Sequence, residues 1–201
     1  MLTKLFQSNK AESKFSVHKP NIVYEFSKKI QPFFLEASAE KRDLVFICIG
    51  TDRSTGDALG PLTGSKLKNL RLPYQIYGTL DAPVHATNLQ EHLALVQKTF
   101  NKPFIIAVDA CLGQIDNVGY LSYGRGSVKP GTAVKKDLPA VGDAYITGIV
   151  NVSGFMEHMV LQSTRLNLVM KMADAIAGAI SFATYDFHTA VNNGERQAQL
   201  H

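Results

Sequence analysis

The fold is decided by two apolar stretches, LVFICIG at residues 44–50 and FIIAVDA at residues 104–110. The first follows charged residues and ends in a glycine. Continuous apolar runs of this kind are typical of strands covered on both faces, as in a parallel sheet. Helical patterns at 21–35, 57–70 and 88–100 and a short strand pattern near 74–80 surround these runs. The alternation of strand and helix predicts an α/β fold.

The pattern changes after residue 110. Strands are expected at 117–124, 131–136 and 144–152, separated by Gly, Pro and Lys rather than by helices. This spacing predicts a mainly parallel sheet with mixed pairing at one edge. One long helix is expected from about residue 156 to 184, with Gly154 at its entry.

Composition predicts one soluble α/β domain at residues 21–201, preceded by a polar arm at residues 1–20. The chain has 201 residues, of which 45% are hydrophobic, and this suits one domain with a sizeable core. Neither a signal peptide nor a membrane span is expected. Cys48 and Cys111 are too few for a disulfide framework and lack metal-ligand spacing. A cytoplasmic location is therefore predicted.

The net charge of +4 is a mild excess, and lysines in the first thirty residues account for part of it. No helix-turn-helix, zinc-finger or aromatic RNA-binding pattern accompanies this charge. We therefore expect no nucleic-acid partner.

Chemistry-bearing residues concentrate in CIGTDRSTGDALGP at residues 48–61. Here the end of a strand meets a polar loop and the start of a helix, a common place for ligands. Phosphate-loop and dinucleotide motifs are both absent, which disfavours nucleotide binding. Asp57 has two readings at this point: a helix-start acid that accepts backbone N–H bonds, or a functional carboxylate.

Asp109 is harder to explain structurally. It ends a very apolar strand, where a carboxylate must reach the sheet edge or be buried at a cost in free energy. Acids in such places usually have a partner or a function. If the two buried strands are parallel neighbours, Asp57 and Asp109 emerge at the same edge. The pair is therefore the candidate site.

The segments GTDRSTGDALGP and AVDA resemble the germination protease of spore-forming bacteria and, more distantly, hydrogenase maturation endopeptidases. In those relatives a glycine-rich turn leads to an acid before A-[LI]-G, and a later strand ends in a second functional aspartate. Asp57 and Asp109 occupy these positions. Across residues 40–185 the chain resembles the YyaC-type sporulation proteins. The resemblance implies a three-layer αβα sandwich of the phosphorylase/hydrolase-like kind found in hydrogenase maturation proteases.

The resemblance also implies what the site lacks. Hydrogenase maturation enzymes use a histidine with the two acids to hold nickel, and Asn151 stands at that position here. An amide is a poor substitute for imidazole as a transition-metal ligand, so no metal or other cofactor is expected. A metal site built from Asp57, His85 and Asp109 is a disfavoured third possibility.

The predicted function is that of an aspartic-type endopeptidase in which Asp57 and Asp109 are catalytic. Its partner would be a protein or peptide substrate, with spore proteins as candidates, in the mother cell or forespore of a sporulating bacterium. Backbone N–H groups of the 50–57 loop could hold the substrate or oxyanion. The remaining residues expected to bind substrate are Gly50, Thr51, Asp52, Arg53, Gly56 and His85.

The alternative is a non-catalytic binding or scaffold protein of the developing spore that retains the fold. The sequence leaves the oligomeric state open. His158 is expected to pack or to form an ion pair. Cys111 lies close to Asp109 but has no recognisable histidine partner for thiol chemistry.

Overall fold

The structure is a computed structural model that describes residues 14–130 and 138–198, with side chains as far as residue 191. Residues 1–13 of the expected arm and the strand expected at 131–136 lie outside the described residues. Phe15 and Ser16, also within the expected arm, form the short strand β1 (Phe15–Ser16) and pair with a later strand. The sheet therefore begins earlier in the chain than residue 21.

Six strands form one sheet in the order β1-β5-β6-β4-β2-β3. The central pairs, β2 with β3, β2 with β4 and β4 with β6, are parallel, whereas β5 and β1 add antiparallel pairs at one edge. This arrangement confirms the predicted mainly parallel sheet with a mixed edge. The remaining bounds are β2 (Leu44–Cys48), β3 (Gln75–Tyr77), β4 (Phe104–Gly113), β5 (Tyr120–Arg125) and β6 (Ala144–Val152).

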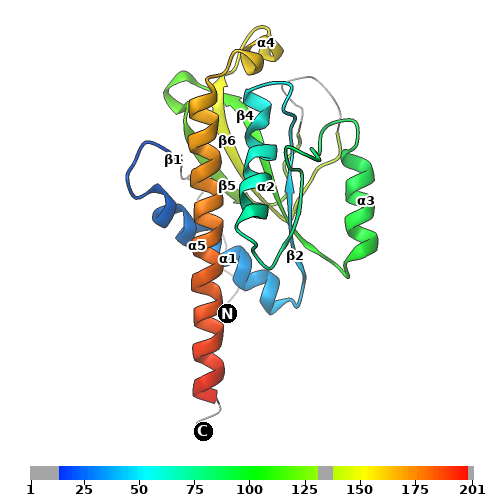
Figure 1. Ribbon diagram of the computed structural model, residues 1–201, viewed down its shortest axis with the longest axis vertical. Coiled ribbons are helices and arrows are strands. Elements are labelled where there is room, and N and C mark those ends of the chain that lie inside the picture. Colours follow the sequence, from blue (N-terminus) through cyan, green and yellow to red (C-terminus); the bar gives the residue numbers. More distant parts are fainter. Residues whose placement is uncertain (1–13, 131–137, 199–201) are drawn as a thin grey trace, which may run out of the picture.

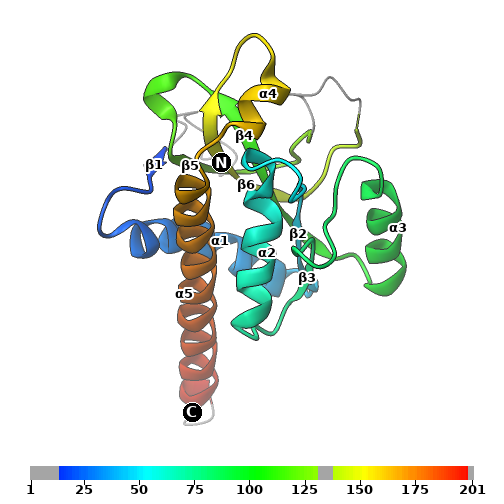
Figure 2. The ribbon, with the colours of Figure 1, turned by 45° about the horizontal axis from the view of Figure 1, so that its top comes forward.

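Helices cover both faces of the sheet, and this confirms the three-layer αβα architecture (Figures 1 and 2). The face with the larger core is covered by α1 (Ile22–Ala39), α2 (Leu59–Asn69) and α5 (Leu166–Ala198), and the other face by α3 (Leu89–Thr99). Alternation along β2 explains the two cores: Phe46 packs toward α1, whereas Val45 and Ile47 pack toward α3. The two cores are the reason why β2 and the first five residues of β4 are apolar at every position.

The single final helix predicted from residue 156 to 184 is wrong. The structure has α4 (Glu157–Gln162), a break at residues 163–165, and then α5. The carbonyl of Val160 would accept the Thr164 N–H in a continuous helix. Instead it accepts the hydroxyls of Ser163 and Thr164 and the side-chain amide of Asn151, at 3.2, 2.9 and 3.1 Å. These side-chain bonds compete with the helix and stop it.

By length and apolar composition, residues 166–191 of α5 could cross a membrane. Half of the most apolar window is buried inside the protein. The buried residues pack against α1, α2 and the sheet, and they include Val169, Met172 and Ile176. The apolar character of α5 is thus accounted for by core packing.

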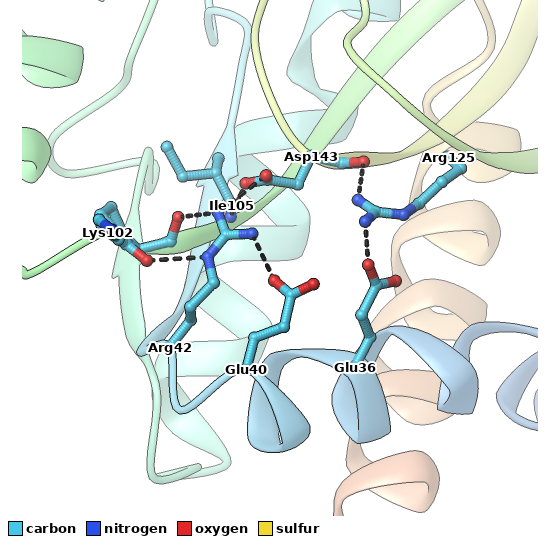
Figure 3. Close-up of polar contacts among 8 residues, drawn as sticks. Glu36, Glu40, Arg42, Lys102, Ile105, Arg125 and Asp143 are labelled. Carbon is cyan, nitrogen blue, oxygen red and sulfur yellow. Dashed lines mark hydrogen bonds and ion pairs between the residues drawn. The ribbon is translucent and has the colours of Figure 1, made fainter.

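The amino-terminal edge of the sheet is held by charged side chains (Figure 3). Arg42, just before β2, donates to the carbonyls of Lys102 and Pro103 at 2.8 and 2.6 Å and to Asp143 at 2.8 Å. Asp143 in turn accepts the Ile105 N–H at 2.9 Å. Three parallel strands are therefore joined where they begin, at the opposite ends from the loops that carry Asp57 and His85.

Candidate active site at the carboxyl edge of the sheet

A cavity of about 810 Å³ opens at the carboxyl ends of β2 and β4. Its wall comes from the loop after β2, the loop before α3, the end of β4 and the short helix α4. Figure 1 shows α4 standing at this end of the molecule, beyond the ends of β4 and β6. Asp57 and Asp109 both line the cavity. The two acids therefore share one edge and one cavity, as the parallel pairing required.

Asp109 lies within β4, opposite Thr147 of β6. Burial raises the pKa of its carboxyl to about 8; the Ala110 N–H, which donates to Oδ1 at 2.9 Å, opposes this rise, and the nearby Asp57 carboxylate adds to it. Desolvation and a like charge both favour the neutral form of an acid. Asp109 is consequently protonated in the folded protein around neutral pH.

Asp57 lies in a single turn of 3₁₀ helix, η1 (Gly56–Ala58), that leads into α2. Burial raises the pKa of its carboxyl as well, and the nearby His158 lowers it. No side-chain capping bond is present at the start of η1 or of α2. A capping role therefore does not explain the acid at this position.

The loop between β2 and η1 folds closely on itself at Gly50. The φ angle of Gly50 is +146°, and an added Cβ would lie 1.9 Å from the carbonyl oxygen of Asp57. That same oxygen accepts the Thr51 N–H at 3.1 Å, while the Gly50 N–H donates to the carbonyl of Val84 at 2.8 Å. These two N–H groups are thus bonded within the protein, contrary to the expectation that this part of the loop offers them to a substrate.

Most of the residues expected to bind substrate lie in the cavity wall: Gly50, Thr51, Asp52, Arg53 and His85. Asp52 and Arg53 are exposed. His85 is held by its own loop, since its N–H donates to Asn88 Oδ1 at 2.8 Å and its Nδ1 lies 2.9 Å from Thr87 Oγ1. Their roles toward a substrate remain predictions.

Gly56 differs from the expectation, because it is buried beneath α4 rather than among the cavity-lining residues. An added Cβ would lie 2.8 Å from Leu161 Cδ2 and 3.0 Å from Thr164 Oγ1. Glycine at this position lets α4 pack directly on η1, so its role is to bring the two elements together.

Helix α4 contributes cavity residues that the sequence analysis missed, namely Glu157, His158 and Leu161. Reading 156–184 as one helix placed these residues on a core helix, far from the site. A signal was present in the polar run Gln162-Ser163-Thr164-Arg165, because Ser and Thr side chains compete with helical hydrogen bonds.

Asn151 holds α4 in place. Its Nδ2 donates to the carbonyl of Val160 and to Thr164 Oγ1 at 3.1 and 3.2 Å, and its Oδ1 accepts the Val152 N–H at 2.8 Å. The amide is therefore engaged on both sides and links β6 to α4. Within residues 14–130 and 138–198, no three His, Cys, Asp or Glu side chains form a group that could hold a metal ion. The absence of a metal stays a prediction.

Comparison with known proteins shows similarity in sequence to one protein and similarity in fold to another. The chain is 54% identical over 159 residues to the "Uncharacterized protein YyaC" of Bacillus subtilis (strain 168), covering 77% of each chain. This confirms the predicted resemblance to YyaC-type proteins. The fold is similar to that of a [NiFe] hydrogenase maturation protease, HycI, from Thermococcus kodakarensis KOD1, at 19% identity and a TM-score of 0.48 over 71% of this chain and 92% of that chain.

A family match extends over the sheet, both aspartates and the first part of α5. It covers residues 14–179, which include every described strand and the whole cavity wall. The chain therefore belongs to the family described as "Protein of unknown function (DUF1256)".

Proposed function

We propose that this protein is an aspartic-type endopeptidase in which Asp57 and Asp109 hydrolyse a peptide bond. The observation that carries the proposal is the placement of two carboxyls in one cavity, both with raised pKa values and with Asp109 near 8. Two nearby carboxyls that differ in ease of ionisation can divide the work of base and acid. Their titration is coupled, so the pair acts as a unit.

Asp57 is assigned as the base and Asp109 as the acid. Asp109 is assigned as the acid because the pKa of its carboxyl is raised more than that of Asp57. The nearby His158 favours the ionised form of Asp57. A general base must be charged before it accepts a proton, and a general acid must carry one. Both conditions are met together at any pH at which Asp57 has lost its proton and Asp109 still holds its own.

The reaction needs only water and the pair. Asp57 takes a proton from water while the oxygen of that water bonds to the scissile carbonyl carbon, and Asp109 gives its proton to the carbonyl oxygen. In the second step the C–N bond breaks. Asp57 returns its proton to the leaving nitrogen, and a hydroxyl of the intermediate returns a proton to Asp109. Both carboxyls regain their starting state, and one water is consumed for each bond cleaved.

The surroundings of the cavity suit a polypeptide substrate. Phe155 is 91% exposed, and Met156 and Met159 are each 55% exposed, all beside the α4 residues that line the cavity. Exposed apolar clusters of this kind are typical of interaction sites. As for the biological setting, the resemblance to the germination protease favours a spore protein as substrate, in the cytoplasm of a mother cell or forespore.

The proposal is tested by incubating the protein with an extract of Bacillus subtilis spores from acidic to neutral pH and mapping new peptide termini by mass spectrometry. Wild type is compared with Asp57→Asn and Asp109→Asn, and with Asp116→Asn as a control, because Asp116 is an exposed acid outside the cavity. We expect termini made by wild type and by the control but not by either site variant.

Two outcomes contradict the proposal. Termini that persist in both site variants would show that the cleavage does not depend on the pair. No termini from folded wild type across the pH range would favour the alternative, a spore protein that binds partners through this cavity without cleaving them.

A further inference from the structure

His158 has no assigned role, yet it stands beside the proposed catalytic pair. It lines the same cavity as Asp57 and Asp109, although it comes from α4, a helix distant in sequence from both. Its Nε2 lies 3.2 Å from Gln162 Nε2, one helical turn further along. Because the ring is exposed, core packing does not account for its position.

Contacts with β6 and with η1 fix the position of helix α4, which carries His158. Asn151, at the end of β6, donates to Val160 of α4 and to Thr164 just beyond it. Leu161 on the same helix is buried against η1, which holds Asp57. Helix α4 is therefore tied to β6 on one side and packed on the Asp57 turn on the other.

We infer that His158 is a third functional residue of the site, a positioning residue whose ring pairs with the Asp57 carboxyl and not with Asp109, and that Asn151 supports it by holding α4. The inference rests on the proposed function for its catalytic meaning. Its physical content, the pairing of an imidazolium with one carboxylate and not the other, can be measured without a substrate.

Electrostatics of the cavity agree with this assignment. A positive charge close to a carboxylate favours its charged form, and His158 acts on Asp57 in this sense. No such effect of His158 accompanies Asp109, which is influenced instead by burial, the Ala110 N–H and Asp57. The other charged or titratable residues that line the cavity are Asp52, Arg53, His85, Cys111 and Glu157.

The test is a carboxyl titration of the full-length protein, uniformly labelled with ¹³C, by NMR. The signals of the two acids are assigned from the spectra of Asp57→Asn and Asp109→Asn. Titrations of wild type are then compared with those of His158→Gln and His158→Lys, with His188→Gln as the matched control. His188 is an exposed histidine on α5 and does not line the cavity.

In His158→Gln we expect the midpoint of Asp57 to move upward by more than in the control variant, and that of Asp109 to move less than that of Asp57. His158→Lys keeps a positive charge and should bring the Asp57 midpoint back toward wild type. A merely structural histidine would not be replaced by lysine in this way. An Asp57 midpoint that agrees in His158→Gln and His188→Gln would overturn the inference.

The supporting role of Asn151 has its own readout. Asn151→Ala should shift the Asp57 midpoint in the same direction as His158→Gln, because α4 is no longer tied to β6. An unchanged midpoint would overturn this part. If spore extracts show no cleavage while His158→Gln shifts Asp57, the proposed function fails and the pairing stands. If cleavage depends on both acids while the midpoint of Asp57 is unmoved, the function stands and the inference fails.

Discussion

Replacing Asp109 by asparagine should change how the stability of this protein depends on pH. The pKa of the Asp109 carboxyl is raised from its ordinary value of 3.8 to about 8 in the folded protein. In the unfolded chain the proton is lost near pH 4, whereas in the folded chain it is kept until about pH 8. Unfolding in this window therefore releases a proton, and the free energy of unfolding of wild type falls as pH rises.

The magnitude follows from the size of the shift. Each unit of pKa difference corresponds to about 1.4 kcal/mol, so the upper limit for the whole window is about 6 kcal/mol. Water that reaches the partly exposed side chain screens this effect, and we expect about 2–3 kcal/mol in practice. This contribution is fully present below about pH 4 and is lost by about pH 8. Asparagine mimics the protonated carboxyl and carries no titration.

The assay is urea unfolding followed by far-UV circular dichroism at several values between pH 4 and pH 8, since the chain has no tryptophan and urea leaves charge interactions unscreened. The difference in unfolding free energy, Asp109→Asn minus wild type, should become more positive with rising pH. Asp116→Asn, an exposed acid that does not line the cavity, is the matched control. A constant difference for Asp109→Asn would refute the reasoning, because it would mean that the folded and unfolded states bind the Asp109 proton equally.

Two further predictions concern stability changes that come from steric clash and from the loss of an ion pair, not from the titration of Asp109. Gly50→Ala should destabilise the protein by about 3 kcal/mol or more in the same urea assay, because the added Cβ would meet a carbonyl oxygen at 1.9 Å. Gly126→Ala is the control: at φ +103° and with nothing within 4 Å of the added Cβ, it should cost only about 1–2 kcal/mol of backbone strain. Equal losses of stability in the two variants would refute the steric argument. Arg42→Met should lower the free energy of unfolding by about 2–3 kcal/mol, because it leaves the partly buried Asp143 carboxylate without its ion pair. The matched change Lys28→Met removes an ion pair whose basic side chain is more exposed and should lower it clearly less. The reverse order would contradict the role of Arg42 in joining the amino-terminal ends of the strands.

Much of the fold could be predicted because the central strands are continuous apolar runs that can be recognised in the sequence. The runs at 44–50 and 104–110 are apolar at every position that the two cores require. Once they are placed as parallel neighbours, geometry brings Asp57 and Asp109 to one edge without further information. The pair was predictable for the same reason, since the position of each acid is fixed by the strand that precedes it.

The rest of the site depends on contacts that the local sequence does not encode. The break between α4 and α5 arises where Asn151, nine residues earlier, bonds to the Val160 carbonyl. Gly56 matters because Leu161, more than a hundred residues later, packs on it. Residues 156–184 have a helical apolar period with or without the break, so periodicity alone could not place His158 in the cavity.

A comparison of the two edges of the sheet separates structural acids from the candidate functional one. At the amino edge, Asp143 is partly buried and is met by Arg42 and by the Ile105 N–H, as expected of an acid whose role is to hold strands together. At the carboxyl edge, no described residue forms an ion pair with Asp109, which instead lies beside a second acid and faces a cavity. The same fold thus stabilises one acid and leaves the other at a cost in stability above pH 4. The Asp109 carboxyl lowers the stability of the folded protein above pH 4, and no described arginine or lysine is placed to pair with it as Arg42 pairs with Asp143. An unpaired acid of this kind is expected where the residue has a chemical role.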